Sequence, residues 1–308
     1  HDLIKAVKDH VGIPVIGNSA FRDPAIAEKF LEDGVEDFAG LGRAWLADEQ
    51  WGRKVQEGRE KELRKCITCM RCFESLNEYN AAGLPAECAV NPRCARELKY
   101  GLPVRGAEGH SAAVIGAGPA GMSAALALAE RGVKVTLIDK TSALGGLVNL
   151  AKEPPHKGSM KWLAEYYEDA FGRLSVDVRL DTEATPELID SLKSEAVVVA
   201  TGGAAITPEL PGVHGENVFS VEDVLSGKAG LTKKNVVLVG AGMTGIETAE
   251  YLCAAGNSVT VVDMLNKIAP DGNGTIVAAV MGRLKQYKTE FLLEHTLKEI
   301  KSDSVVLE

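Results

Sequence analysis

Hydrophobic and polar residues alternate along the first part of the chain in the pattern of repeating βα units. Ile13–Gly17 predicts a buried strand, and Val35–Gly40 predicts a second short one. Between them, Asp23–Gly34 predicts a helix, since it has a proline at an early position and a glycine as its end. The next helix is expected over Arg43–Asp48. This order predicts a piece of an α/β barrel or of a doubly wound sheet.

The pattern changes twice further along the chain. Over Glu60–Gly109, cysteine, glycine and proline are frequent and no long periodic run occurs. A segment of this kind needs something other than a hydrophobic core to fold it, and a metal centre would serve. From Ser111 onward the α/β pattern returns, and it contains two near-copies of one motif.

Each copy consists of a hydrophobic strand, a glycine-rich turn of the form GxGxxG, a helix, and a second strand that ends in aspartate. The turns are Gly116–Gly121 (GAGPAG) and Gly240–Gly245 (GAGMTG), and the acids are Asp139 and Asp263. The first glycine permits the tight turn, the second lets the backbone approach a pyrophosphate, and the third lets helix and strand pack closely. The acid can accept hydrogen bonds from a ribose hydroxyl. Two dinucleotide sites are therefore predicted.

Composition restricts the partners. Apolar residues make up 45% and charged residues 25% of the 308 residues, as in an ordinary globular protein with a core, and length suggests roughly two domains. The net charge of −9 argues against a nucleic-acid partner. No run of about 18 apolar residues and no secretory signal are present, so we expect a cytoplasmic location and no membrane partner. The sequence does not decide whether the chain forms a homo-oligomer.

Five of the six cysteines are clustered, which favours metal binding over a disulfide framework. Cys66, Cys69 and Cys72 are separated by two residues each, and a more distant cysteine follows. This spacing fits a [4Fe–4S] cluster better than a zinc ribbon, which more often has two separated CxxC pairs. The fourth ligand is Cys88 or Cys94, and we choose Cys88. The sixth cysteine, Cys253, is expected in the core.

Together, the cysteine run, the CAVNPR segment and the two turns resemble the old-yellow-enzyme-related family of FMN/[4Fe–4S]/FAD reductases. This family includes 2,4-dienoyl-CoA reductase, bacterial NADH:flavin oxidoreductases and trimethylamine dehydrogenase. The resemblance covers essentially the whole chain. The cysteine run departs from the family, which often has three residues between its second and third cysteines and a shorter gap before the fourth.

The resemblance implies which copy holds which ligand. The first turn, a following LGGLV segment and a VVVATGG strand are similar to the FAD-binding half of two-dinucleotide flavoproteins. The implied FAD residues are Gly116, Ala117, Gly118, Pro119, Ala120, Gly121, Asp139, Lys140, Gly145, Gly146, Leu147, Ala200, Thr201 and Gly202. The implied NAD(P)H residues are Gly240, Gly242, Met243, Thr244, Gly245, Glu247 and Asp263. Asp263 favours NADH because its carboxylate would repel the 2′-phosphate of NADPH, although nearby Lys267 could partly offset this repulsion.

The resemblance also implies that the chain begins with the last two βα units of an FMN-binding TIM barrel. The implied phosphate-binding residues are Asn18, Ser19, Gly42 and Arg43. We expect barrel residues over 1–58, an iron–sulfur segment and linker over 59–110, the first part of an FAD-binding domain over 111–230, and an incomplete NAD(P)H-binding domain over 231–308. The first six barrel units, with the substrate pocket and its catalytic residues, are expected to lie outside this chain.

The expected function is a relay of electrons from NADH through FAD and the [4Fe–4S] cluster to FMN, where an activated C=C bond of a small substrate is reduced. Three alternatives stay open. An amine dehydrogenase of the same architecture would run the electrons outward, an electron-transfer subunit would serve another enzyme, and a zinc-binding module would only mediate interactions. The residues that select the substrate are expected to lie outside this chain.

Overall fold

A computed structural model describes residues 2–18, 21–79, 82–101 and 104–308. The chain divides into two compact units. One comprises His1–Gly146 and Lys161–Thr201, and the other comprises Leu147–Met160 and Gly202–Glu308. Both units contain parallel β-sheets with helices, which confirms the predicted α/β class. Among the helices of the described residues, none has both the length and the apolar character needed to cross a membrane.

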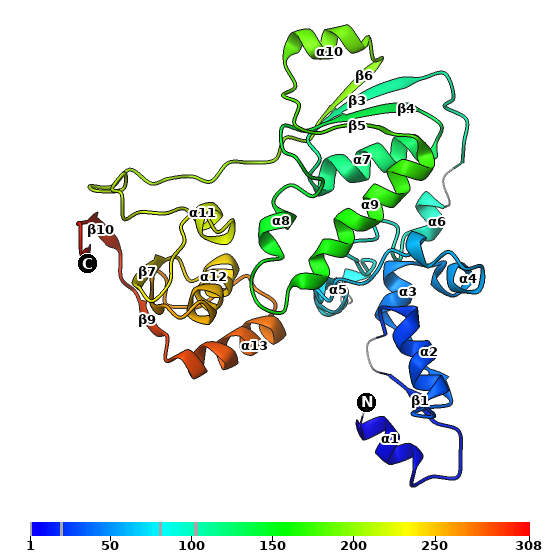
Figure 1. The fold of residues 1–308 in the computed structure, drawn as a ribbon, viewed down its shortest axis with the longest axis horizontal. Helices are drawn as coiled ribbons and strands as arrows, with labels where there is room; N and C mark the ends of the chain where they lie inside the picture. Colours follow the sequence, from blue (N-terminus) through cyan, green and yellow to red (C-terminus); the bar gives the residue numbers. More distant parts are fainter. Residues whose placement is uncertain (1, 19–20, 80–81, 102–103) are drawn as a thin grey trace. The chain divides into compact units, whose positions relative to one another are not determined.

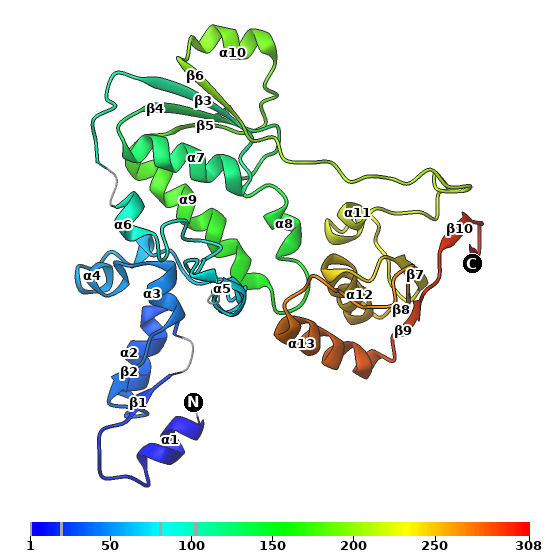
Figure 2. The same cartoon turned by 180° about the vertical axis from the view of Figure 1, so that it is seen from behind.

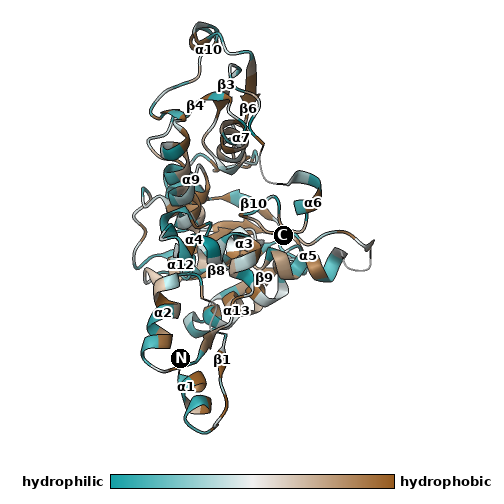
Figure 3. Cartoon of the chain, turned by 90° about the vertical axis from the view of Figure 1, so that its right-hand side faces the viewer, coloured by the Kyte–Doolittle hydropathy of each residue, from teal (hydrophilic) through white to brown (hydrophobic). Residues whose placement is uncertain are grey.

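The first unit has a short βαβ element near its N-terminal end, after helix α1 (Asp2–Lys8). Strand β1 (Ile16–Gly17) pairs in parallel with β2 (Phe38–Ala39), and α2 (Pro24–Glu32) connects them. Asp23 caps α2, since its side chain accepts a hydrogen bond from the amide of Ala25 (3.1 Å). Hydrophilic and hydrophobic residues alternate along α2 (Figure 3), as in an amphipathic helix. The two strands exist where predicted but are shorter than predicted, and their origin in an FMN barrel remains a prediction.

Short helices and loops make up the rest of this part. The helices are α1 (Asp2–Lys8), α3 (Arg43–Ala47), α4 (Trp51–Gln56), the 3-10 helix η1 (Glu60–Glu62), α5 (Arg71–Tyr79) and α6 (Glu97–Tyr100). Over Glu60–Gly109 the described chain contains no strand, in agreement with the irregular pattern of its sequence. The cysteines of this segment therefore lie on loops and on the first turn of α5.

The first unit also contains a four-stranded parallel sheet in the order β5-β4-β3-β6. Its strands are β3 (Ser111–Ile115), β4 (Lys134–Ile138), β5 (Asp177–Arg179) and β6 (Ala196–Val199). Its helices are α7 (Pro119–Glu130), α9 (Lys161–Leu174) and α10 (Pro186–Leu192). Figure 1 shows α7 and α9 on one face of this sheet. Val114, Leu137 and Met122 are fully buried between the sheet and these helices, which explains why β3 and β4 are mostly apolar, whereas Val197 and Val199 of β6 are exposed.

The second unit repeats this arrangement on a smaller scale. Its parallel sheet has the order β7-β8-β9, and α12 and α13 pack on it (Figure 2). The strands are β7 (Asn235–Val239), β8 (Ser258–Asp263), β9 (Glu290–Leu293) and the antiparallel pair β10 (Leu297–Ile300) and β11 (Val305–Leu307). The helices are α8 (Val148–Ala151), η3 (Gly158–Met160), α11 (Val221–Leu225), α12 (Met243–Ala254), α13 (Gly274–Leu284) and η4 (Lys285–Tyr287). Cys253 lies in the core of this unit, as predicted.

Close packing of helix on strand depends on the third glycine of each turn. A Cβ atom on Gly121 would lie 1.7 Å from the carbonyl oxygen of Gly116, and one on Gly245 would lie 1.9 Å from that of Gly240. Both obstacles are backbone atoms, which cannot move aside without breaking the turn. The sequence pattern therefore reflects a steric requirement that exists before any ligand binds.

We expect Gly121→Ala to destabilise the first unit by about 1–3 kcal/mol or more, because overpacking against backbone cannot relax. Gly172→Ala in α9 is the matched control. A Cβ there meets no atom within 4 Å, so alanine should stabilise the helix by roughly 0.5–1 kcal/mol. Urea unfolding followed by circular dichroism measures both changes. Equal stability of Gly121→Ala and the wild type would contradict this account.

Candidate functional site

The first glycine-rich turn connects β3 to α7. Gly116 has φ +102°, and a Cβ on it would lie 2.3 Å from the carbonyl oxygen of Ala200, so only glycine fits there. Gly118, in contrast, has no atom within 4 Å of its would-be Cβ. It precedes the first turn of α7, where Pro119 and Ala120 are exposed. The backbone at Gly118 is thus open to a ligand at the N-terminus of a twelve-residue helix.

Asp139, at the end of β4, holds this turn in place. Its Oδ2 accepts a hydrogen bond from the amide of Ala117 (2.6 Å), and its Oδ1 accepts two from Thr141, at 2.8 Å from the amide and 2.7 Å from the hydroxyl. Burial alone would raise the pKa of this carboxyl, but these hydrogen bonds and the charge of the exposed Lys140 lower it below the ordinary value. A carboxylate has about four acceptor positions, so it retains capacity for a ribose hydroxyl.

A second loop lies against the turn. The amide of Gly145 donates to the carbonyl of Ala117 (2.9 Å), and a Cβ on Gly146 would lie 3.0 Å from Cα of Gly118. Ala200, at the end of β6, donates its amide to Ile115 (2.8 Å). The structure thus brings together most of the predicted FAD residues. Leu147 is the exposed N-cap residue of α8, and Thr201 and Gly202 are exposed after β6.

The second turn, between β7 and α12, has the same construction. Gly240 has φ +107°, and Gly242 is open to solvent in the way that Gly118 is. Asp263 accepts a hydrogen bond from the amide of Ala241 (2.6 Å) with Oδ2, and one from Leu265 (2.7 Å) with Oδ1. The duplication of the sequence motif is therefore also a duplication of its hydrogen bonds.

The first helical turns of α12 carry the other predicted NAD(P)H residues. Met243 packs against Gly272, Thr244 is exposed, and Glu247 is mostly buried. Oε2 of Glu247 lies 2.6 Å from Nζ of Lys157, which lies just before η3. Sequence analysis did not select Lys157, because 90 residues separate it from its partner and it belongs to no motif.

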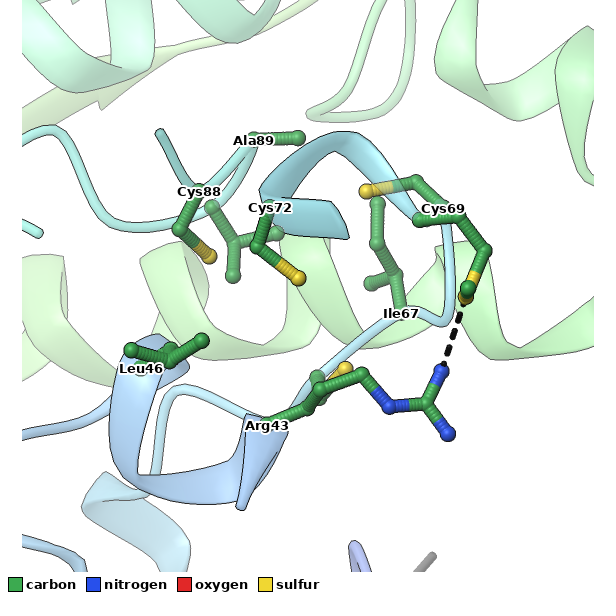
Figure 4. A pocket seen from close by; sticks show the side chains of 10 residues that line it. Arg43, Leu46, Ile67, Cys69, Cys72, Cys88 and Ala89 are labelled. Carbon is green, nitrogen blue, oxygen red and sulfur yellow. Dashed lines mark hydrogen bonds between the residues drawn. The ribbon is translucent and has the colours of Figure 1, made fainter. Parts of the chain in front are cut away.

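The four cysteines Cys66, Cys69, Cys72 and Cys88 line one pocket. Figure 4 shows the side chains of Cys69, Cys72 and Cys88 around it together with Arg43. Thr68 and Met70, on either side of Cys69, both have φ +60°, a left-handed conformation that is uncommon for residues other than glycine. The backbone on both sides of Cys69 is therefore held in an uncommon conformation. Strain of this kind persists only where surrounding contacts maintain it.

Ion pairs and hydrogen bonds connect the two segments of the chain that carry the cysteines of the pocket. Glu87, adjacent to Cys88, pairs with Arg71 (2.8 Å) and with Arg96 (3.0 Å). The fully buried hydroxyl of Ser75 accepts from the amide of Glu87 (2.9 Å) and donates to the carbonyl of Cys72 (3.1 Å). Ser75 thereby connects the segment of Cys72 to that of Cys88. Nothing in the spacing of these residues indicated this role.

Burial affects the thiols of this segment. It is the main cause that raises the pKa of Cys72 and of Cys88, and neighbouring thiols add to it. Cys94 is 1% exposed, does not line the pocket, and has its pKa raised by burial to about 11. Among the described residues, no group of three His, Cys, Asp or Glu side chains could hold a single metal ion. In a [4Fe–4S] cluster each cysteine binds a different iron, so the ligands need not converge on one point.

The predicted FMN-phosphate residues lie at the ends of β1 and β2. Asn18 is exposed directly after β1, Gly42 is the N-cap residue of α3, and Arg43 begins that helix. Nη1 of Arg43 donates to Sδ of Met70 (3.2 Å), so this arginine also borders the cysteine pocket. Ser19 lies outside the described residues. Phosphate binding by this group remains a prediction.

Comparison with known protein families shows the family to which the two glycine-rich turns belong. Residues 110–308 match the family model described as pyridine nucleotide-disulphide oxidoreductase. The chain belongs to this family. Both glycine-rich turns lie within the matched residues of this oxidoreductase family.

Individual relatives confirm the predicted resemblance to the old-yellow-enzyme-related reductases. NADH oxidase of Thermoanaerobacter brockii is 40% identical over 273 residues, which are 87% of this chain and 42% of that protein. Cinnamate reductase of Clostridium sporogenes is 34% identical over 88% of this chain and 39% of that protein. The structure of a 2-naphthoyl-CoA reductase superposes with a TM-score of 0.93 at 29% identity, over all of this chain and 46% of the other. The chain thus spans less than half the length of each.

The residues present fit the cofactors of such an oxidoreductase. Each turn offers an open glycine backbone at the N-terminus of a twelve-residue helix and an acid at the end of the following strand. These features suit a pyrophosphate and a ribose, respectively. The cysteine pocket offers four thiols, which is the ligand set of an iron–sulfur cluster.

We expect Asp139→Asn to destabilise the protein at neutral pH by about 1–2 kcal/mol, because an amide cannot accept all three hydrogen bonds. The folded-state pKa of Asp139 is lowered, so its contribution is complete above the unfolded value of about 3.8 and is lost as the pH falls through the folded value. The difference between wild type and variant should thus be constant from neutral pH to about pH 5 and shrink below 3.8. Urea unfolding at several pH values measures it. A difference that grows on acidification would contradict this assignment.

Proposed function

We propose that this chain is the electron-delivery part of an NADH-dependent flavin/iron–sulfur oxidoreductase that reduces an activated C=C bond of an enoate or enoyl-CoA type. One observation carries the proposal: a pocket lined by four cysteines occurs in the same chain as two complete dinucleotide-binding turns. The names of two relatives, cinnamate reductase and 2-naphthoyl-CoA reductase, support the substrate class. The proposed path of electrons is from NADH through FAD and a [4Fe–4S] cluster to FMN.

The two turns would hold the dinucleotides, FAD at Gly116–Gly121 and NADH at Gly240–Gly245. In each, helix N-terminal amides would face the pyrophosphate, and the open glycine would let it approach the backbone. Bound flavin accepts a hydride and releases electrons singly, which is the chemistry that the protein itself lacks. Asp263 supports NADH over NADPH, since its carboxylate would repel a 2′-phosphate.

Lys157 and Glu247 form a further part of the NADH site. Their ion pair is mostly buried, with side-chain exposures of 26% and 14%, so it is weakly screened by solvent. Lys157 fixes the carboxylate of Glu247 at the start of α12, beside the turn that would hold NADH. Glu247 would then orient the nicotinamide end of the ligand through a fixed acceptor rather than a mobile one.

Cys66, Cys69, Cys72 and Cys88 would bind the cluster as thiolates, and a cluster so held carries one electron at a time. The hydrogen bonds of Ser75 to Glu87 and to Cys72 connect the segments of Cys72 and Cys88 beside the pocket. Asn18, Ser19, Gly42 and Arg43 would bind the phosphate of FMN. The guanidinium of Arg43 is suited to two phosphate oxygens.

The direction of electron flow can be tested anaerobically. We expect NADH to bleach the absorbance of bound flavin, and NADPH to do so much more slowly, because Asp263 disfavours the 2′-phosphate. Asp263→Ser should narrow the difference between the two. Stopped-flow absorbance with both nucleotides on the FAD-loaded chain measures the rates. If NADH left the flavin oxidised, electron entry from NADH would be refuted, and the outward flow of an amine dehydrogenase would replace this proposal.

Iron content tests the cysteine assignment. We expect the wild-type chain, purified anaerobically, to be brown and to contain about four irons per chain. Cys88→Ser should lose most of the iron, because Cys88 lines the pocket, whereas Cys94→Ser should retain it, because Cys94 is buried outside the lining. Iron and sulfide analysis with the visible spectrum measures this. Zinc without iron, or loss of iron only in Cys94→Ser, would refute the assignment.

A further inference from the structure

A buried arginine connects the two segments that carry the pocket's cysteines. Arg64 stands two residues before Cys66, and only 6% of its surface is exposed. Its Nη1 donates to Oδ1 of Asn91 (3.0 Å), three residues after Cys88. Asn91 is itself 1% exposed. One guanidinium thus joins both cysteine segments from the inside.

The hydrogen-bond partners of this guanidinium are uncharged. Nη2 donates to the hydroxyl of Tyr166 (2.8 Å) on α9, and Cζ of Arg64 lies 4.8 Å from the centroid of the same ring. Nε is buried without a hydrogen-bond partner. Within the part of the chain that the structure describes, no carboxylate forms an ion pair with Arg64, although burying a charge is costly without one.

Three acids of this region contact other cations, but two of the three share one arginine, Arg93. The pairs are Asp48 with Lys54 (2.7 Å), Glu49 with Arg93 (3.6 Å) and Glu130 with Arg93 (3.5 Å). Asp48 and Glu49 offset part of the Arg64 charge, and Asp48 also accepts a hydrogen bond from the backbone amide of Arg64 (2.9 Å), but no carboxylate of the described residues forms an ion pair with the guanidinium itself. A positive charge is therefore fixed beside the cysteine segments, where little water screens it.

We propose that the buried positive charge of Arg64 raises the reduction potential of an iron–sulfur centre bound by the cysteines. This inference rests on the proposed function. Reduction adds one electron and makes the site more negative by one unit. A fixed cation nearby stabilises the reduced state more than the oxidised state, and net charge is one of the factors that set cluster potentials.

Charge and geometry can be separated by the choice of side chain. Arg64→Gln removes the charge and keeps hydrogen-bonding groups, whereas Arg64→Lys keeps the charge and loses the planar fork. Tyr166→Phe removes one neutral partner and leaves the charge in place. Arg173→Gln on α9 is the matched control, since it also removes one positive charge, but from a side chain that is 41% exposed and screened by solvent.

The experiment uses the full iron-loaded chain and measures two quantities: iron content, and the midpoint potential from a dithionite titration followed by electron paramagnetic resonance. We expect Arg64→Gln to keep its iron and to have a lower midpoint potential than the wild type. Arg64→Lys, Tyr166→Phe and Arg173→Gln should stay close to the wild type. A merely structural role of Arg64 would change iron content and leave the potential unmoved.

Two results would overturn the inference alone. One is an unchanged potential in iron-loaded Arg64→Gln, and the other is a potential in Arg64→Lys as low as in Arg64→Gln. If Arg64→Gln fails to fold or to bind iron, Arg64→Lys decides: a wild-type potential supports the role of the charge, and a lowered one refutes it. A wild-type chain without iron would refute the proposed function itself, and this inference with it.

Discussion

Each of the two dinucleotide motifs depends on a hydrogen bond of the same kind, in which an amide of the turn donates to the carboxylate at the end of the neighbouring strand. The distance is 2.6 Å from Ala117 to Asp139 and 2.6 Å from Ala241 to Asp263. Because the two strands are parallel neighbours, this bond fixes where the turn lies relative to the sheet edge. The open glycine, the helix N-terminus and the acid itself then face a common place, where a dinucleotide can bind.

The cysteine pocket is held together in a different way. Its thiols come from two segments separated by a helix and by loops, and no sheet aligns them. Individual side-chain contacts take the place of the regular hydrogen bonds of a sheet. They are the ion pairs of Glu87 and the hydrogen bonds of the Ser75 hydroxyl and of the Arg64 guanidinium. Each of these contacts involves at least one side chain, unlike the backbone hydrogen bonds of a sheet. The geometry of the pocket therefore depends on individual residues, whereas that of the turns depends on the backbone.

The secondary structure was largely predictable, because it follows from local pattern. The apolar strands β3, β4, β7 and β8, the helices after each turn and the capped helix α2 lie where the alternation predicted them. The strands β1 and β2 came out shorter, since only two residues of each find a partner in the described chain. Contacts between distant residues were not predictable: Lys157 with Glu247, and Arg64 with Asn91 and Tyr166, belong to no spacing motif.

The sequence by itself determined the α/β class, the two dinucleotide turns, their acids and the clustering of cysteines. These features are local, since each is encoded by residue types at fixed short spacing, and steric limits on glycine leave little alternative. Only the tertiary structure decided that Cys88, and not Cys94, lines the pocket with the other three thiols, and that a charged Arg64 is buried between their segments. The reason is that burial and side-chain contact between distant segments depend on how the chain packs, and spacing along the sequence carries no information about that.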